Sequence, residues 1–240
     1  MSNLWSFNEI DKKLSEQFSG FLPDRIFDIH AHIYRVSDLS LSGPSVFKNG
    51  PSDVSVDVWR TQSEKFLCGK KLEGGLFFPT PTTNLDLENA NNYLLSQIKK
   101  NKQSRGLVMV SPDMNPEDLS FLLKHSGIVG IKPYHLFSKE HPTWESSVSG
   151  FLPEWQMKLA DAHSSIVMLH LVKNKSIADP DNIKEIRGMC TRYPRIKLIL
   201  AHAARSFHAP HAKEGIKKLR GLDNIWFDLS GICEHEALLE

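Results

Sequence analysis

Short apolar runs alternate with segments of helical period along the chain from Arg25 onward. In the helical segments, apolar residues recur at the spacing that gives a helix one apolar face. The apolar runs have the length and composition of buried strands; they lie at residues 25–32, 72–80, 105–112, 128–134, 165–171, 196–203 and 224–230. Because strands that alternate with helices form a parallel sheet, this pattern predicts an α/β fold.

Two of the predicted helices have clear start signals. Asn115 and Asp179 are each followed by proline and acidic residues, the order of a cap, a first helical residue and acids at the positive end of the helix dipole. The predicted strands are one fewer than a closed (β/α)8 barrel contains. We therefore expect a TIM-type barrel that lacks its eighth strand at the C-terminus. It forms a single domain at residues 25–240, after an amphipathic helical lead-in at residues 1–24.

The segment from Ile33 to Lys71 is long for a connection between a strand and a helix. It contains Gly-Pro pairs at residues 43–44 and 50–51 and then a predicted helix around Val54 to Leu67. An active-site wall and a variable surface excursion are equally good interpretations of such a segment.

Composition excludes several classes of protein. The chain has 240 residues with 29 basic and 28 acidic side chains, a formal net charge of +1, which argues against a nucleic-acid binder. There is no apolar run of membrane-spanning length. The three cysteines are scattered, and the N-terminus lacks the order of a signal peptide. We expect a cytoplasmic protein that binds neither nucleic acid nor membrane, with the choice between monomer and homodimer left open.

Four histidines fall at the carboxyl ends of predicted strands: His30 and His32, His170, and His202. In a parallel barrel this is the face that holds the active site. His30 and His32 share one face of their strand because strand side chains alternate. Neutral imidazoles bind divalent metals, zinc above all, and such an ion can lower the pKa of a water to about 7. The alternative for each histidine is a buried, hydrogen-bonded structural role.

These residues belong to motifs that resemble the amidohydrolase superfamily, closest to its amidohydrolase 2 group of TIM-barrel metal-dependent hydrolases. The motifs are FDIHAH, GIKPY, MLH, LAHAAR and FDLSG, in that order, and the resemblance covers residues 25–231. The group also contains aminocarboxymuconate-semialdehyde decarboxylase. The resemblance implies that His30, His32 and His170 bind a divalent metal ion. It further implies that His202 lies beside this ion and polarises substrate or shuttles a proton.

The resemblance leaves the substrate contacts less defined. Lys132 matches a lysine that is carboxylated and bridges two metals in some branches but is usually not a ligand in this group. We expect it to bind substrate, and a structural ion pair is an equally good interpretation. Tyr134 either lines the substrate pocket or packs in the barrel. Arg205 is expected to meet an anionic substrate group with its planar fork, or to form a surface ion pair.

The chain departs from the family at its end. The family places a metal-binding aspartate after the eighth strand, whereas this sequence continues beyond Gly231 only as ICEHEALLE. Asp228 lies in the seventh-strand motif, and we expect it to be a structural hydrogen-bond acceptor. The departure predicts either an incomplete piece of a longer protein or a shortened, inactive homologue.

Three functions follow from these observations. The first is a metal-dependent hydrolase that acts on a small-molecule amide, ester or lactone, with His202 as the catalytic residue. The second is a metal-dependent nonoxidative decarboxylase of a small carboxylate, because the same ligands serve both reactions. The third is an inactive fragment that keeps a metal or ligand pocket. The sequence leaves the identity of the substrate open.

Overall fold

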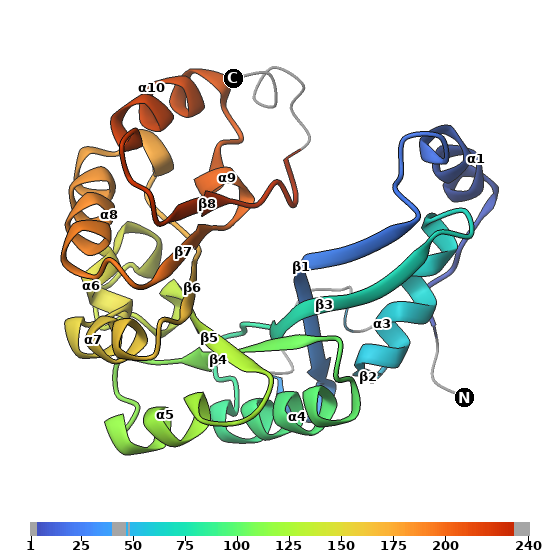
Figure 1. Cartoon of the computed structure of the whole chain (residues 1–240), viewed down its shortest axis with the longest axis horizontal. Helices are drawn as coiled ribbons and strands as arrows, with labels where there is room; N and C mark the ends of the chain where they lie inside the picture. The colour runs from blue at the N-terminus through green and yellow to red at the C-terminus, as the bar shows by residue number, and fades with distance from the viewer. Residues whose placement is uncertain (1–3, 40–46, 48, 233–240) are drawn as a thin grey trace. The chain divides into compact units, whose positions relative to one another are not determined.

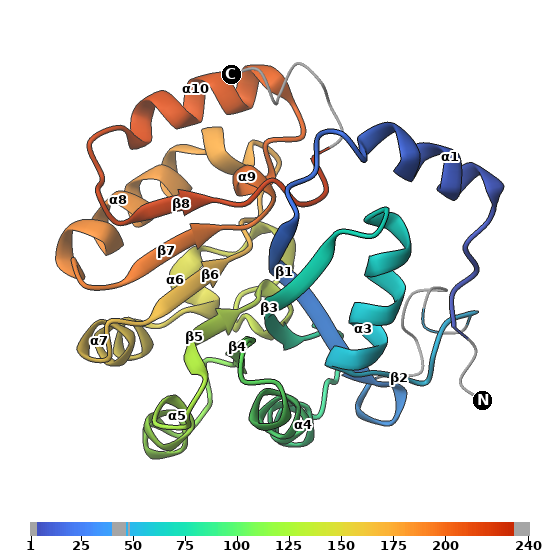
Figure 2. The ribbon, with the colours of Figure 1, turned by 45° about the vertical axis from the view of Figure 1, so that its right-hand side comes forward.

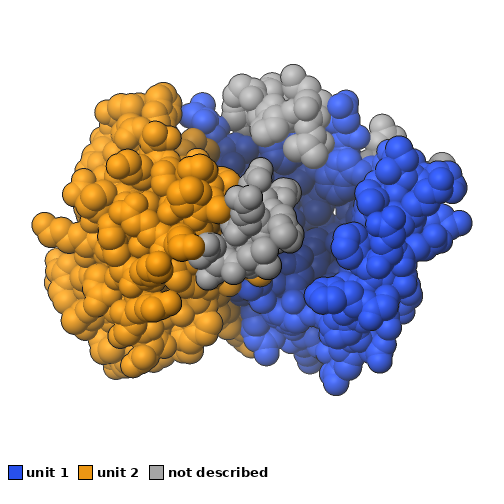
Figure 3. All heavy atoms as spheres, turned by 90° about the horizontal axis from the view of Figure 1, so that it is seen from above, with its two compact units in different colours: residues 1–106 blue, residues 107–240 orange. Residues whose placement is uncertain are grey.

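The computed structural model describes residues 4–39, 47 and 49–232 of the chain. These residues form two compact units, residues 1–106 and 107–240 (Figure 3). Within the described residues, every helix is too short or too polar to cross a membrane.

The first unit is built around a long strand, β1 (Arg25–Arg35). It pairs in parallel with β3 (Lys71–Pro79), and its last two residues pair antiparallel with the short β2 (Asp53–Val54). β3 pairs in parallel with Arg105 and Gly106, the first two residues of β4 (Arg105–Val110), which continues into the second unit. Among its described residues, this unit contains the helices α1 (Glu9–Phe18), α3 (Val56–Ser63) and α4 (Leu87–Lys100).

The second unit holds strands β4 (Arg105–Val110), β5 (Ile128–Pro133), β6 (Ile166–Leu169), β7 (Lys197–Leu200) and β8 (Ile225–Phe227) in sequential order (Figure 1). The strands from β5 to β8 are parallel. Its helices are α5 (Pro116–Leu123), α6 (Val148–Phe151), α7 (Glu154–Ala162), α8 (Pro180–Arg192), α9 (His202–Arg205) and α10 (Ala209–Leu219). Figure 2 shows α7, α8 and α10 along one side of β6, β7 and β8.

The predicted strands and the α/β class are confirmed. Each of the predicted runs contains one strand of the sheet, and the additional strand, β2, is only two residues long. The strands β6 and β7 are shorter than predicted because the chain leaves the sheet just before His170 and Ala201. The described residues therefore contain seven strands of the TIM-barrel pattern, an incomplete barrel.

β5 and β6 approach each other closely at Gly130. Gly130 on β5 pairs with Ile166 on β6, and a Cβ at position 130 would lie 1.9 Å from the Ile166 carbonyl oxygen. Most apolar residues of these strands are buried, and Ile131, Val167 and Leu169 are completely so. Parallel strands that are covered on both faces read as continuous apolar runs, which explains why the sequence pattern located them.

The predicted helix starts are also confirmed. The Asn115 side chain accepts a hydrogen bond from the Glu117 amide at 2.8 Å, and the Asp179 side chain caps α8 in the same way. The helix predicted after the long connection is α3, extended by a 3-10 turn at Glu64–Phe66. Residues 40–46 and 48 of that connection lie outside the described residues.

Three short 3-10 turns lie in the segments that follow β5 and β6. They are η3 (His135–Phe137), η4 (Thr143–Glu145) and η5 (Ser176–Ala178). In α/β proteins, the chain segments after the carboxyl ends of parallel strands carry the functional groups. These turns lie in such segments, as do most of the predicted site residues of the second unit.

Candidate metal and substrate site

The first unit presents the two histidines of β1 together. Their ring centroids are 5.2 Å apart, and both rings meet Phe78 edge-on at centroid distances of 5.0 Å for His30 and 4.5 Å for His32. The Asp28 carboxylate accepts hydrogen bonds from the His30 amide at 2.9 Å and from the Trp59 indole at 3.3 Å. The predicted His30 and His32 pair is therefore held on one face of the strand by an aromatic wall.

His170 in the second unit follows the end of β6 and is largely buried. Its ring centroid lies 4.8 Å from that of Tyr134, 5.8 Å from that of His135 and 5.3 Å from that of His202. Burial, with the nearby Lys132 charge next in weight, lowers the pKa of His170 to about 2. Among the described residues its buried Nδ1 has no hydrogen-bond partner. The imidazole is thus neutral at physiological pH, the form that binds a metal.

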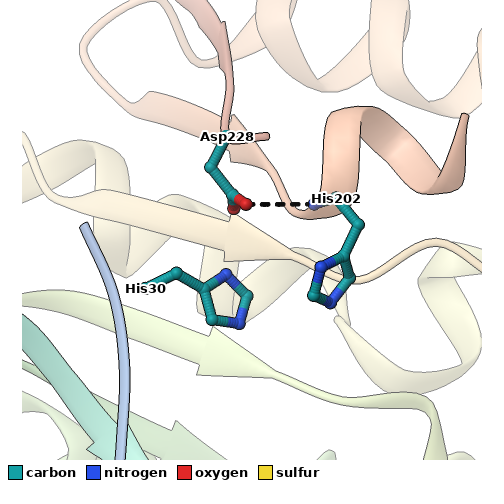
Figure 4. A group of neighbouring side chains, drawn as sticks. All are labelled: His30, His202 and Asp228. Atoms are coloured by element: carbon teal, nitrogen blue, oxygen red, sulfur yellow. Dashed lines mark hydrogen bonds between the residues drawn. The ribbon is translucent and has the colours of Figure 1, made fainter. Parts of the chain in front are cut away.

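His202 opens α9, directly after β7. Its amide donates to the Asp228 carboxylate at 3.2 Å (Figure 4), and its Nδ1 lies 2.7 Å from the Ser230 carbonyl oxygen. Because a carbonyl only accepts, Nδ1 carries the proton, and Nε2 is the basic nitrogen of the ring. A ring nitrogen of His202 and a carboxylate oxygen of Asp228 lie within 4.8 Å of one another.

Asp228 is almost completely buried, just after β8. Besides the His202 amide, its carboxylate accepts a hydrogen bond from the Ser230 amide at 3.0 Å and a short one from the Ser230 hydroxyl. Its backbone oxygen accepts from the Ala203 amide at 2.5 Å. These bonds give Asp228 the acceptor role that the sequence predicted.

Lys132 is the next-to-last residue of β5 and has a fully buried side chain, 1% exposed. Burial lowers the pKa of its ammonium group to about 7, against the opposing effect of the Asp228 charge. Lys132 is therefore less protonated near neutral pH than an exposed lysine would be.

Arg205 closes α9 and is half-buried. Its guanidinium donates to the Leu171 carbonyl at 3.4 Å. Burial raises the pKa of Tyr134 and lowers that of His135, and the Arg205 charge favours ionised Tyr134 and disfavours protonated His135. The Arg205 guanidinium therefore lies close to the Tyr134 phenol and to the imidazoles of His135 and His170.

Within the second unit the structure brings together five of the predicted site residues: Lys132, Tyr134, His170, His202 and Arg205. His30 and His32 are brought together in the first unit. That all four histidines share one metal site stays a prediction. Sequence reasoning gave little weight to His135 and missed Ser230; the position of Ser230 immediately after a strand end was the available signal.

Comparison with known proteins identifies the fold. No family model matches the sequence, and no curated protein matches it. Among solved structures, a protein assigned as a 2-pyrone-4,6-dicarboxylic acid hydrolase from Pseudomonas putida matches with a TM-score of 0.59 and 18% identity, over 91% of this chain and 75% of that chain.

Two further structures agree. A protein from Acinetobacter baumannii with the same assigned activity, determined with citric acid bound, matches with a TM-score of 0.56 and 18% identity, over 85% of this chain and 70% of that chain. The 4-oxalomesaconate hydratase of Rhodopseudomonas palustris matches with a TM-score of 0.52 and 14% identity, over 85% and 74% of the two chains. These likenesses show the fold of the chain. The chain thus has the fold that the motifs implied.

Proposed function

We propose that this chain is a metal-dependent hydrolase of the amidohydrolase type that opens an ester, lactone or amide in a small molecule bearing a carboxylate. The observation that carries the proposal is His170, a neutral and largely buried imidazole beside His202. The Arg205 guanidinium and the buried Lys132 lie nearby, and all four residues are at or just beyond the carboxyl ends of strands. Two further imidazoles, His30 and His32, lie on β1, which continues beyond the predicted end of this strand to Arg35.

Imidazole nitrogens suit a divalent ion. His170 would be one ligand, because its ring stays unprotonated and its Nδ1 has no hydrogen-bond partner among the described residues. The resemblance implies that His30 and His32 are the other ligands. Zinc is the expected ion for three imidazole ligands. A divalent ion bound there supplies Lewis acidity toward the reacting carbon and toward water.

The side chains of the second unit divide the remaining tasks. His202 is fixed as the Nδ1–H tautomer, so its Nε2 is suited to take a proton from the attacking water and to return it to the leaving group. Asp228 orients the loop of His202 through backbone amides. Arg205 binds a substrate carboxylate with its planar fork, and Lys132 supplies a second positive charge or a proton donor.

The substrate class rests on this cationic lining and on the neighbours. A 2-pyrone is a cyclic ester, and the neighbours' named compounds carry carboxylates: a pyrone dicarboxylic acid, oxalomesaconate and citric acid. A carboxylate-bearing lactone would fit Arg205 and Lys132 while presenting its ester carbon to His202.

The first experiment measures bound metal and turnover in the same preparations. Wild type is compared with His170→Ala and with His163→Ala, a control at an exposed histidine. We expect stoichiometric divalent metal in wild type and in the control, and loss of metal in His170→Ala. Turnover is followed as acid release from 2-pyrone-4,6-dicarboxylate and from an unsubstituted 2-pyrone.

The substrate pair tests the role of Arg205. We expect Arg205→Met to raise KM for the dicarboxylate more than it lowers kcat, because the lost contact is made to the bound substrate as well as to the transition state. Carbon dioxide release in place of ring opening would instead support the decarboxylase. A folded wild type that binds no metal and turns over neither compound would overturn the proposal and support an inactive fragment.

A further inference from the structure

The residues from His202 to Arg205 form a left-handed turn. Their φ angles are +56°, +46°, +58° and +56°, so four successive residues that all carry a Cβ adopt the left-handed region. This conformation is disfavoured for residues other than glycine and is normally visited by single residues. A run of this kind persists only where its surroundings hold it, and this run carries both His202 and Arg205.

Buried polar groups hold the turn from two sides. On the β8 side, Asp228 accepts from the His202 amide with its carboxylate and from the Ala203 amide with its backbone oxygen, at 3.2 and 2.5 Å. On the η5 side, the Ser176 hydroxyl donates to the Ala204 carbonyl at 2.6 Å. Ser176 is 4% exposed, so water does not compete for this bond.

The η5 side is tied to the loop that carries His170. The amide nitrogen of the Asn182 side chain donates to the Val172 carbonyl at 3.0 Å and to the Ser176 carbonyl at 2.9 Å. Asn182 is fully buried in the first turn of α8. One amide group thus joins the residue two positions after His170 to the serine that holds the left-handed turn.

The place of η5 is itself fixed by close packing. A Cβ at Gly215 of α10 would lie 2.4 Å from the Ile177 carbonyl oxygen, so α10 lies directly against the backbone of η5. The Ser176 hydroxyl therefore reaches the turn from a rigid support.

We infer that Ser176 and Asn182 are positioning residues that hold the left-handed turn in place. By doing so they set the distance of the His202 ring and the Arg205 guanidinium from His170. The inference rests on the proposed function only for what these side chains do to a substrate. The positioning itself is a property of the folded chain and is measurable without metal or substrate.

The test uses Ser176→Gly in the full chain without added metal. Glycine removes the hydroxyl and suits the backbone, because Ser176 has a φ of +45°. We expect amide hydrogen exchange at Ala203 and Arg205 to accelerate by about tenfold, as for the loss of one buried hydrogen bond. The Ala201 amide, which donates to the Leu169 carbonyl at 2.9 Å, is the internal reference and should keep its rate.

A second readout separates positioning from mere stability. Nitrogen-15 spectra of histidine report which ring nitrogen of His202 carries the proton, and wild type should show the Nδ1–H form imposed by Ser230. In Ser176→Gly we expect the Nε2–H form to become populated. Ser104→Ala, at a buried serine of the first unit, is the matched control and should change neither readout.

Ser176→Cys covers the case in which the glycine variant does not fold, because a thiol has similar size but is a weak donor. It should change both readouts in the same direction by a smaller amount. Exchange rates and tautomer identical to wild type in the folded variant would overturn the inference. A wild type without metal or turnover would refute the proposed function and leave this result standing.

Discussion

The two units position their histidines by different physical means. On β1, His30 and His32 take their directions from a strand paired with β3, and the Phe78 ring, itself completely buried, fixes both imidazoles by contact. In the second unit, His202 stands on a strained turn that buried acceptors and donors hold in place. The first arrangement depends on packing, the second on satisfied polar groups.

This difference determines how each arrangement fails. When a packed side chain is shortened, the loss of stability grows with the volume of the cavity that remains after the surrounding residues have partly relaxed. A buried polar network fails when a single partner is removed, because the group left behind keeps its desolvation penalty. Substitutions that alter packing in the first unit and buried polar or strained residues in the second unit test this contrast.

The largest expected effect is in the first unit. Phe78→Ala should reduce the free energy of unfolding by about 3–5 kcal/mol, because it removes a fully buried aromatic ring and leaves a cavity. Urea unfolding followed by circular dichroism measures the loss. Phe78→Leu, which keeps most of the volume, should lose clearly less. Equal losses in the two variants would show that the aromatic ring as such, and not its volume, supports the histidine pair.

The next effect concerns pH and Lys132. Its pKa is about 7 in the folded chain, against an ordinary value of 10.5. Between these values the unfolded lysine holds a proton that the folded one has released, so the free energy of unfolding should rise with pH above 7, by up to about 1.4 kcal/mol per unit.

Lys132→Met should lack this contribution. Urea unfolding of both proteins at intervals from pH 7 to 8.5 gives the difference directly, and other titrating groups cancel in the subtraction. Parallel stability curves for wild type and variant would contradict a lowered pKa for Lys132.

The smallest expected effect is a gain in the free energy of unfolding. Ala204→Gly should raise the free energy of unfolding by about 0.5–1 kcal/mol, because glycine adopts the left-handed conformation without the steric conflict of a Cβ. Ala201→Gly is the matched control: it has a φ of −63°, and the same change should reduce stability by a similar amount. A loss in both variants would mean that the turn carries no strain to relieve.

The parts of the molecule that the sequence predicted are those with a repeating local signal. Apolar runs located every strand of the barrel pattern, and the caps at Asn115 and Asp179 marked two helix starts. The alternation of His30 and His32 on β1 followed from the period of a strand. In each case neighbouring residues in the chain decide the structure.

The left-handed turn had no such signal. Alanine at positions 203 and 204 favours a right-handed helix, and the groups that override this preference lie far away in the sequence, at Ser176 and Asp228. The Ser230 contact to His202 likewise depends on two loops meeting after different strands. Long-range polar contacts of this kind require the fold before they can be seen.

Gly130 has a consequence for how sequences with this fold can diverge. Any side chain at this position would collide with the Ile166 carbonyl, so β5 and β6 could no longer pair in their register. Lys132, two residues further along the same strand, is a proposed substrate contact, so a change of substrate would be accommodated there. We therefore expect glycine at position 130 in any protein that pairs these two strands in this register, whatever reaction it catalyses.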